Sequence, residues 1–264
     1  MFLVGVSASP TWTVSAAESQ DLPQQVLDIS KGSDEIYGPG APIEHVENSD
    51  ERFSSGGVDH THQYIVSNAL KILNNDKGAS ILNTKAAMIC EYTDWPDVVG
   101  NETDYGTFAG HFYDPDTGKN WMGQKNPTAR TRAETYYQSA VAAYKDGYTD
   151  KAMQYLGKGT HYVSHHASNL TAVNSNHSDF EKYVDRHRTE YTIAGNSFGT
   201  NVYSSAENTA VGDMLYSAAK DAKALAGLAQ NKDTYSSAGN QSVQNAIKTI
   251  SKYIYKFGKE VGIY

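Results

Sequence analysis

The chain has 264 residues, of which 39% are hydrophobic and 20% are charged, and its formal net charge is −8. This length allows one large domain or two small ones with a buried core, and the composition excludes a chain that is disordered throughout. The acidic balance gives no basic surface for nucleic acid or for an anionic membrane. With Cys90 as the one cysteine, any metal must be held by histidine and carboxylate side chains.

The N-terminal part reads as a leader followed by a linker. Residues 2–17 are apolar, small and rich in Ser and Thr, and they end in VSAA, a pattern similar to a signal-peptidase site. Breakers containing Gly and Pro then recur up to residue 57. We therefore expect residues 1–58 to be a signal-like leader and pro-segment, and the protein to be exported. No stretch reaches the roughly 20 apolar residues that span a bilayer.

Residues 59–264 are expected to form a single all-α domain. Their apolar residues recur at the spacing of three and four that is typical of amphipathic helices, and no run with the two-residue alternation of a strand competes with them. The helices that we expect cover residues 62–73, 79–92, 131–148, 150–161, 180–191, 206–228 and 243–257. Residues 94–126 are predicted to form a long loop rich in aromatic residues and glycine, and loops of this length tend to carry function.

Several histidines and carboxylates stand at spacings that suit a shared metal ion. Residues three or four apart lie on one face of a helix. The pairs at this spacing are His161 and His165, His177 and Glu181, and Asp94 and Asp97. His62, at the head of the first helix, and His111, in the long loop, extend the set. Imidazole and carboxylate ligands without thiolates favour zinc.

The same residues also have purely structural explanations. A single histidine is more often a surface or hydrogen-bonded residue than a ligand. Ser178 and Glu181 form a capping box, Asp94 could end a helix, and Asp97 could belong to a turn with Pro96. No Gly-x-Ser-x-Gly elbow and no phosphate-binding glycine motif occurs, so a metal site is the chemistry that the sequence favours.

The order of these motifs resembles the bacterial zinc-dependent phospholipase C family. The resemblance rests on HQYIV at His62, HFYDPDTG at His111, YLG and then HY at His161, HASN at His166, and His177 four residues before Glu181. It covers residues 59–264. It implies an all-helical domain of the kind that Gram-positive bacteria export, up to three zinc ions in a cleft, and hydrolysis of the glycerol–phosphate bond of phospholipids. The products would be diacylglycerol and a phosphorylated headgroup.

The resemblance also implies roles for individual residues. The implied zinc ligands are Asp97, His111 and His161 at one zinc, His62 as the ligand of the first helix, and His166, His177 and Glu181 at a separate zinc. Asp97 is also implied to be the general base, and Asp94 is the alternative to it. Phe108 matches an aromatic residue that lines the headgroup pocket, whereas Val98 stands where the family has a pocket tyrosine. The implied partner is phospholipid at a membrane or micelle surface, bound by a monomer.

Two features depart from the family pattern. Family members use their mature N-terminal residue as a zinc ligand a short distance before the first-helix histidine; cleavage after Arg52 would expose Phe53, nine residues before His62. His165 stands where the family has an aspartate that bridges two zinc ions. An imidazole binds one zinc ion but cannot bridge two, so either His165 substitutes in part, another carboxylate enters, or the binuclear site is lost.

Two other functions follow from these observations. A single-strand nuclease with the same helical scaffold also cleaves phosphodiesters at an aromatic-lined cleft. A catalytically weak lipid- or metal-binding relative is the second, because the bridging aspartate is missing. Headgroup preference and the number of zinc ions stay open at this point.

Overall fold

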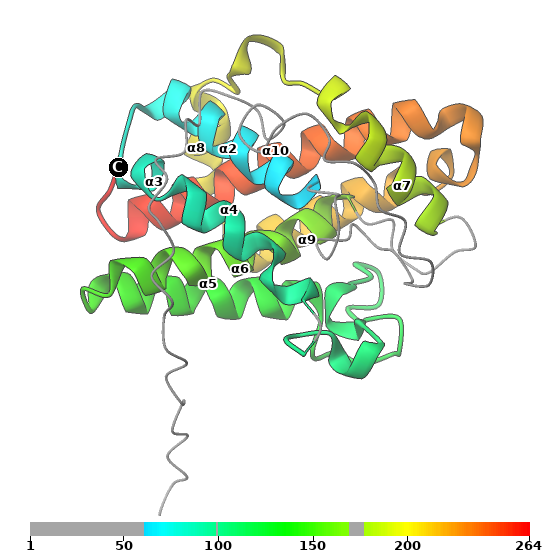
Figure 1. The fold of residues 1–264 in the computed structure, drawn as a ribbon, viewed down its shortest axis with the longest axis horizontal. Helices are drawn as coiled ribbons and strands as arrows, with labels where there is room; N and C mark the ends of the chain where they lie inside the picture. Colours follow the sequence, from blue (N-terminus) through cyan, green and yellow to red (C-terminus); the bar gives the residue numbers. More distant parts are fainter. Residues whose placement is uncertain (1–60, 99, 169–176) are drawn as a thin grey trace, which may run out of the picture.

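The computed structural model describes residues 61–98, 100–168 and 177–264, with the side chains of residues 165–168 and 177–178 excepted (Figure 1). Over these ranges the chain is helical and has no strand, and its one ladder contact is an isolated bridge between Asp114 and Lys119. The all-α prediction is confirmed. The predicted leader and pro-segment, residues 1–58, lie outside the described residues.

The α-helices in the described ranges are α2 (Thr61–Lys77), α3 (Ile81–Thr84), α4 (Ala86–Asp94), α5 (Ala129–Lys145), α6 (Thr149–Ser168), α7 (His177–His187), α8 (Thr200–Glu207), α9 (Val211–Ala224) and α10 (Tyr235–Glu260). Short 3-10 turns stand between them, namely η1 (Trp95–Asp97), η2 (Asp104–Gly106), η3 (Ala109–His111), η4 (Arg188–Glu190), η5 (Ala194–Asn196), η6 (Leu228–Gln230) and η7 (Lys232–Thr234). Where the helices are described, none combines the length and the apolar character that a membrane crossing requires.

The core is organised around α10, the longest of these helices. Its buried apolar side chains recur every three or four residues and therefore form one stripe; they are Val243, Ile247, Ile250, Ile254 and Phe257. Figure 1 shows α10 running across the width of the molecule, and it contacts α2, α6, α7, α8 and α9. The hydrophobic face that the sequence predicts for this helix is the face that the fold buries.

α5 and α6 form a hairpin of two helices along the lower edge of the molecule in Figure 1. The turn between them contains Gly147 with a φ of 85°, a left-handed conformation that glycine adopts without a steric penalty. α6 also contacts α4 and α10, so it lies between elements from both ends of the described chain. Residues on α6 are thereby placed in the interior, His161 among them.

The contact between α6 and α4 depends on a glycine. A Cβ atom at Gly157 would lie 2.5 Å from the backbone oxygen of Ile89 in α4, so only glycine permits this approach. α4 runs directly into η1. Lys158, the next residue of α6, holds its Nζ 3.3 Å from the centroid of the Trp95 ring, the first residue of η1. The two contacts together fix η1, and with it Asp97, against α6.

The second expected helix is broken in the structure, which the sequence did not predict. Residues 79–92 do not form one helix, because the chain leaves helical geometry at Lys85 between α3 and α4. The helix expected from residue 150 begins one residue earlier, at Thr149, so Asp150 lies in the first turn of α6, where it forms an ion pair with Lys85 at 2.7 Å. A carboxylate in the first turn still stabilises the helix, since it faces the positive end of the helix dipole.

Two C-terminal boundaries also differ. The helix expected over residues 206–228 is divided, because α8 ends at Glu207 and α9 begins at Val211. The last helix is longer than the expected residues 243–257, since it starts at Tyr235. The first turns of this helix carry small and polar residues, so their apolar period is weak. Tertiary packing stabilises these turns.

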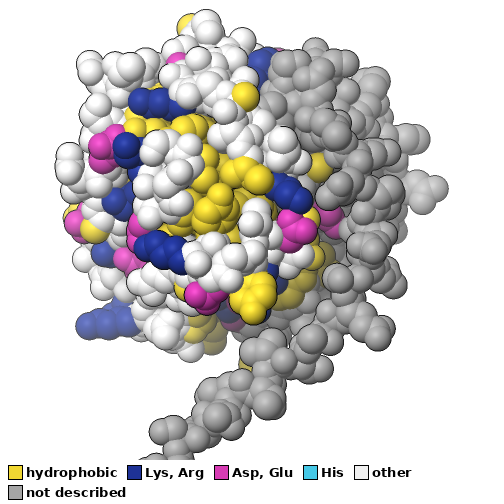
Figure 2. All heavy atoms as spheres, turned by 90° about the vertical axis from the view of Figure 1, so that its left-hand side faces the viewer, with side chains coloured by type: hydrophobic (Ala, Val, Ile, Leu, Met, Phe, Trp, Pro, Cys, Tyr) yellow, Lys and Arg dark blue, Asp and Glu magenta, His cyan; other side chains and the backbone are white. Residues whose placement is uncertain are grey.

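One face of the molecule carries an apolar patch, which is distant from His161 of α6. Figure 2 looks onto the end that is on the left in Figure 1, where α3, the turn between α5 and α6, and the C-terminus lie. Apolar side chains gather in the middle of this face, with charged side chains around them. Ile81 and Tyr148 are exposed apolar residues of these elements. His161 is about 18 Å further along α6, so the patch and that histidine are at different ends.

Gly157→Ala is expected to destabilise the protein. The added Cβ meets a backbone oxygen, which cannot rotate away, and the cost of overpacking exceeds what alanine returns as helix propensity. We expect the free energy of unfolding in urea to fall by about 1–2 kcal/mol. Gly227→Ala is the control, since no atom lies within 4 Å of its Cβ position. Equal stability of the two variants would show that α4 does not depend on this approach.

Candidate metal centre

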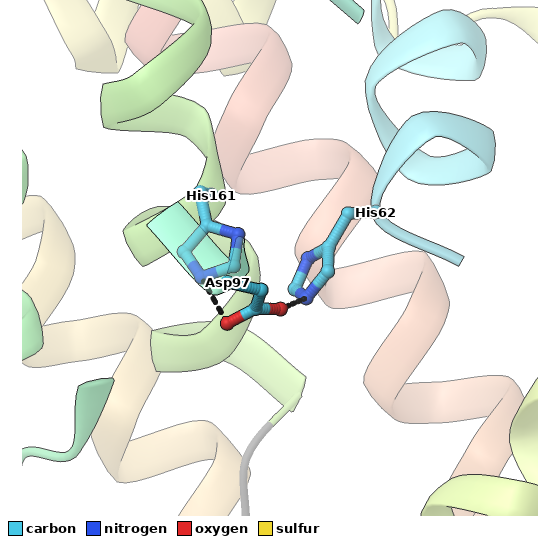
Figure 3. Close-up of side chains that lie close together, drawn as sticks. All are labelled: His62, Asp97 and His161. Carbon is cyan, nitrogen blue, oxygen red and sulfur yellow. Dashed lines mark ion pairs between the residues drawn. The ribbon is translucent and has the colours of Figure 1, made fainter. Parts of the chain in front are cut away.

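Three histidines converge on one carboxylate in the interior. His62 comes from the first turn of α2, Asp97 from the end of η1, His111 from the end of η3, and His161 from α6. Nε2 of His111 and of His161 lie 3.2 and 3.4 Å from Asp97 Oδ1. His62 Nε2 lies 3.9 Å from Oδ2 of the same carboxylate, and Figure 3 shows Asp97 between His62 and His161. Segments that are distant in the sequence therefore present their donor atoms to one point.

These distances suit a single metal ion. Ligand atoms at about 2.0–2.1 Å from a tetrahedral zinc ion lie roughly 3.3 Å apart. The two pairs at Asp97 Oδ1 match that separation, and donor atoms of His62, Asp97 and His161 all lie within 4.8 Å of one another. The donor set, nitrogen and oxygen without sulfur, is one that zinc accepts. The residues present therefore fit a zinc ion.

Hydrogen bonds at the other ring nitrogens orient two of the histidines. Nδ1 of His161 lies 2.7 Å from the carbonyl oxygen of Thr93, which can only accept, so this nitrogen carries the proton. Nδ1 of His62 meets the hydroxyl of Ser164, which donates its own hydrogen to the carbonyl of His161 and therefore accepts from His62. With Nδ1 protonated, a ring that is neutral has its lone pair on Nε2, the nitrogen that faces Asp97 and that a metal ion would bind. This is the outer arrangement typical of metal-ligating histidine.

The electrostatics of the cluster favour the protonation states that a metal ion requires. Burial alone would raise the pKa of Asp97, but its interactions with His161 and His111 outweigh burial and hold the pKa well below its usual range. Burial lowers the pKa of His111, against the opposing pull of Asp97. Near neutral pH the site therefore combines an ionised carboxylate with a neutral His111 imidazole, and metal binding needs no proton to be removed from either.

Asp94 and Asp97, the two alternatives for the carboxylate, are placed differently. Asp97 is the one that faces the histidines, with 7% of its side chain exposed. Asp94, one turn earlier, accepts a hydrogen bond from Gln63. The structure therefore brings Asp97 rather than Asp94 into this cluster.

Of the second group of expected ligands, the structure describes the side chain of Glu181. This carboxylate is buried, at 2% exposure, on α7. The side chains of His166 and His177, and of His165, lie outside the described residues. Asp185, one turn after Glu181 and also buried, accepts a hydrogen bond from Thr61, the neighbour of His62. The acidic face of α7 therefore packs beside the start of α2.

The aromatic residue Phe108 lies against the cluster. Its ring centroid is 5.3 Å from that of His111 in an edge-on arrangement, and its backbone is left-handed with a φ of 50°. Val98, in the place of the family's pocket tyrosine, is exposed. Phe53, the expected mature N-terminus, lies outside the described residues. The wall that the described residues offer next to His111 is thus formed by Phe108.

Sequence patterns did not single out the residues that support the cluster. Ser164 is three residues after His161 and Asp185 is four after Glu181, so helical spacing from a candidate ligand is the signal that could have found them. Thr93 contributes a backbone oxygen, which any residue type would supply. No sequence signal points to it.

Comparisons with known proteins identify relatives of this chain. The family model for zinc dependent phospholipase C matches residues 61–249. The phospholipase C of Paraclostridium bifermentans is 28% identical over 236 residues, which cover 76% of this chain and 59% of the relative. A phospholipase C of Bacillus cereus is 30% identical over 168 residues, which cover 54% of this chain and 56% of the relative. This chain thus spans under two thirds of the length of these relatives.

A solved structure shares the fold. The alpha toxin from Clostridium absonum superposes with a TM-score of 0.67 at 26% identity, over 77% of this chain and 65% of that chain. The range that the family model matches includes His62, Asp97, His111 and His161.

Asp97→Asn is expected to weaken zinc binding far more than Asp94→Asn. Asparagine keeps the shape of either residue but removes the charge, and in the structure Asp97 faces the three imidazole nitrogens. We expect the zinc dissociation constant to rise by at least about 100-fold for Asp97→Asn, measured by competition with a chromogenic chelator. For Asp94→Asn we expect a change below about fivefold. The reverse order would make Asp94 the ligand.

Proposed function

Because this chain belongs to the zinc-dependent phospholipase C family, we propose that it is a phospholipase C that hydrolyses the glycerol–phosphate bond of phospholipids. The products are diacylglycerol and a phosphorylated headgroup. The observation that carries the proposal is the convergence of His62, His111 and His161 on the Asp97 carboxylate. Phosphodiester hydrolysis needs an activated water and a positive charge beside the phosphate, and zinc supplies both when it is bound.

Asp97 has two roles in this mechanism. Its Oδ1 faces His111 and His161 and, with their Nε2 atoms, would hold the metal. Its Oδ2 points to the other side, toward His62, where it can orient the attacking water and accept its proton.

The remaining proposed ligands are His62, His166, His177 and Glu181, which bring the capacity of the cleft to as many as three zinc ions. The Glu181 carboxylate is buried, as the proposed role in the interior of the site requires. The contact between Thr61 and Asp185 supports this assignment, because it holds the face of α7 that carries Glu181 against the first turn of α2. His62 is the neighbour of Thr61, so the two parts of the site adjoin.

Exposed aromatic residues support a lipid surface as the partner. The long loop displays Tyr105, fully exposed, and Trp121 and Met122, each about half exposed. The Trp121 Nε1–H donates to the carbonyl of Thr107, which precedes Phe108, so this apolar edge adjoins the aromatic wall of the site. Tyr and Trp favour the boundary between water and lipid. The net charge of −8 suits zwitterionic lipid better than an anionic polymer.

The protein that carries out this reaction is proposed to be an exported monomer. Residues 1–58 would act as its leader and pro-segment, and removal after Arg52 would leave Phe53 as the mature N-terminus. N-terminal sequencing of the exported protein tests this point. A start near Ala17 would contradict the removal of a pro-segment.

A catalytically weak relative is the second candidate function. The observation that favours it is His165 in place of the bridging aspartate, because one imidazole cannot hold two zinc ions at a shared position. Such a protein would bind zinc and lipid but hydrolyse slowly. A single-strand nuclease is a weaker candidate, since the acidic balance opposes a polyanion.

Hydrolysis of phosphatidylcholine in mixed micelles tests the proposal. We expect release of water-soluble phosphocholine, loss of release with a chelator, and its return with added zinc. Asp97→Asn should lower the rate by about 100-fold or more, because it removes a ligand and the acceptor that orients the water. Asp213→Asn, an exposed carboxylate of α9, is the matched control. Zinc binding without hydrolysis would favour the weak relative, and release of nucleotides from single-stranded DNA would favour the nuclease.

The exposed aromatic residues are expected to matter for aggregated substrate only. The double variant Tyr105→Asn and Trp121→Gln removes their rings; asparagine is chosen because it tolerates the left-handed backbone of Tyr105. We expect hydrolysis of phosphatidylcholine vesicles to fall about tenfold, which corresponds to about 1.4 kcal/mol of surface affinity, and hydrolysis of a monomeric short-chain lipid to stay unchanged.

Tyr148→Ser provides the control for that variant. Tyr148 is another exposed aromatic residue, in the turn before α6 and about 20 Å along that helix from His161. It should affect neither substrate. Equal loss on vesicles and on monomers in the double variant would show that the loop serves the site itself and not the lipid surface.

A further inference from the structure

The loop that carries His111 has a strained backbone. Three of its non-glycine residues are left-handed, with φ of 49° at Asp104, 56° at Tyr105 and 50° at Phe108. Such residues persist only where surrounding contacts enforce them. Hydrogen bonds within the loop, such as that from the Gly110 N–H to Asp104, join its η2 and η3 turns. These bonds do not connect the loop to the helices of the core, so its position against Asp97 depends on contacts from outside it.

Arg132, on α5, makes the contacts that do so. Its Nη1 donates to the carbonyl of Glu102 at 3.0 Å and to Asp104 Oδ2 at 3.2 Å, and its Nη2 donates to Asp104 Oδ1 at 2.5 Å. Asp104 Oδ2 also accepts the backbone N–H of Gly110 at 2.7 Å. A single guanidinium therefore connects the entry of the loop to the residue directly before His111.

Gly110 rests on the guanidinium itself. A Cβ at this position would lie 2.5 Å from the Cζ and Nη1 of Arg132. Its φ is not in the left-handed region, so an added Cβ would act through this close approach, by displacing the guanidinium, and not through backbone conformation. The register of His111 is thus set by a planar group packed against the preceding peptide.

The same guanidinium reaches the segment that carries His161. Arg132 Nη1 lies 3.2 Å from the hydroxyl of Tyr162, and that hydroxyl donates to Glu102 Oε2 at 2.5 Å. The Tyr162 ring is 5.1 Å from that of His111 and 5.0 Å from that of His161. Two of the candidate ligands are therefore packed on one tyrosine, which Arg132 and Glu102 hold in place.

We propose that Arg132 is a positioning residue of the metal centre. Through Asp104, Gly110 and Tyr162 it sets the separation of His111 Nε2 and His161 Nε2, so that both face Asp97 Oδ1. Lysine cannot replace it, because a point charge cannot contact both oxygens of Asp104 and the carbonyl of Glu102 at once. The inference rests on the proposed function to the extent that the cluster binds zinc, and it does not depend on the substrate.

Arg132→Lys tests the proposal in the full chain. We expect its zinc dissociation constant, measured by chelator competition, to rise about 10- to 100-fold, as is typical when an outer contact of a metal ligand is lost. The visible absorption of the cobalt-substituted protein should shift or weaken, since it reports the geometry of the ligands. Arg130→Lys is the matched control, because Arg130 lies on the same helix and contacts Tyr113, Glu134 and Asp213 but not the loop from Glu102 to His111. It should keep the wild-type spectrum and an affinity within about twofold.

Two further variants guard against a folding defect in Arg132→Lys. Asp104→Asn removes the charge from the partner, and Gly110→Ala displaces the guanidinium while both charges stay in the chain. Both should move zinc affinity and the cobalt spectrum in the same direction as Arg132→Lys. Thermal unfolding of the metal-free proteins is measured alongside, so that loss of stability and loss of site geometry are separated.

The outcomes distinguish this inference from the proposed function. Unchanged zinc affinity and an unchanged cobalt spectrum in folded Arg132→Lys and Gly110→Ala overturn it, even if their unfolding temperature falls, because Arg132 would then serve the fold alone. Zinc binding by the wild type without phospholipid hydrolysis overturns the proposed function and leaves this inference standing on the affinity data. A wild type that binds no zinc overturns both.

Discussion

The arrangement of this protein depends on one buried carboxylate with three imidazoles around it. Removing an ionised Asp97 from water is costly unless positive or hydrogen-bonding groups replace the water. His111 and His161 at Oδ1 and His62 at Oδ2 surround this carboxylate, and together with a metal ion held between them they would provide that replacement. The three histidines come from a loop and two different helices. The fold must therefore bring α2, η1, η3 and α6 to one point. The apolar stripes of these helices stay packed in the core, because the polar cluster lies where the four elements meet.

Irregular segments supply two of the four residues, and rigid helices hold those segments. η1 is fixed by the approach of α4 at Gly157 and by Lys158 against Trp95, both on α6. η3 is fixed from α5 through Arg132. α5 and α6 pack together as one hairpin, so η1 and η3 are both held in place by the same pair of helices. The distances between the donor atoms can then be held to within about 0.5 Å, although the backbone that carries two of these residues is irregular.

The sequence carries the ligands more clearly than it carries their supports. The apolar period predicts the helices, since they bury apolar stripes in the core. The order of the motifs carries the family resemblance, which implies His62, Asp97, His111 and His161, with Asp94 as the alternative to Asp97. The break at Lys85 and the early start of α10 escape prediction, because tertiary packing overrides a weak local signal there.

The residues that hold the candidate ligands in place could not be predicted from the sequence, for a different reason. Arg132 lies in an Arg-, Thr- and Ala-rich helix start where a solvent-facing side chain would be expected, and only the fold brings it under Gly110. Contacts of this kind link residues that are about 30 positions apart and leave no period or spacing in the chain. The residue type of a metal ligand is restricted by the metal chemistry. The residue type of a supporting side chain is restricted only by its position relative to the ligand, which the sequence does not show.

His165 bears differently on two proposed properties of the site, metal binding and catalysis. α6 continues as a helix to Ser168, so residue 165 stands one helical turn after His161. A carboxylate offers two oxygens to two ions, whereas an imidazole offers one nitrogen to one ion. Asp97, His111 and His161 would hold a zinc ion without a bridging ligand, since catalytic zinc sites have three protein ligands. Under the proposed function, His165 would therefore bear on the rate of hydrolysis more than on the binding of metal.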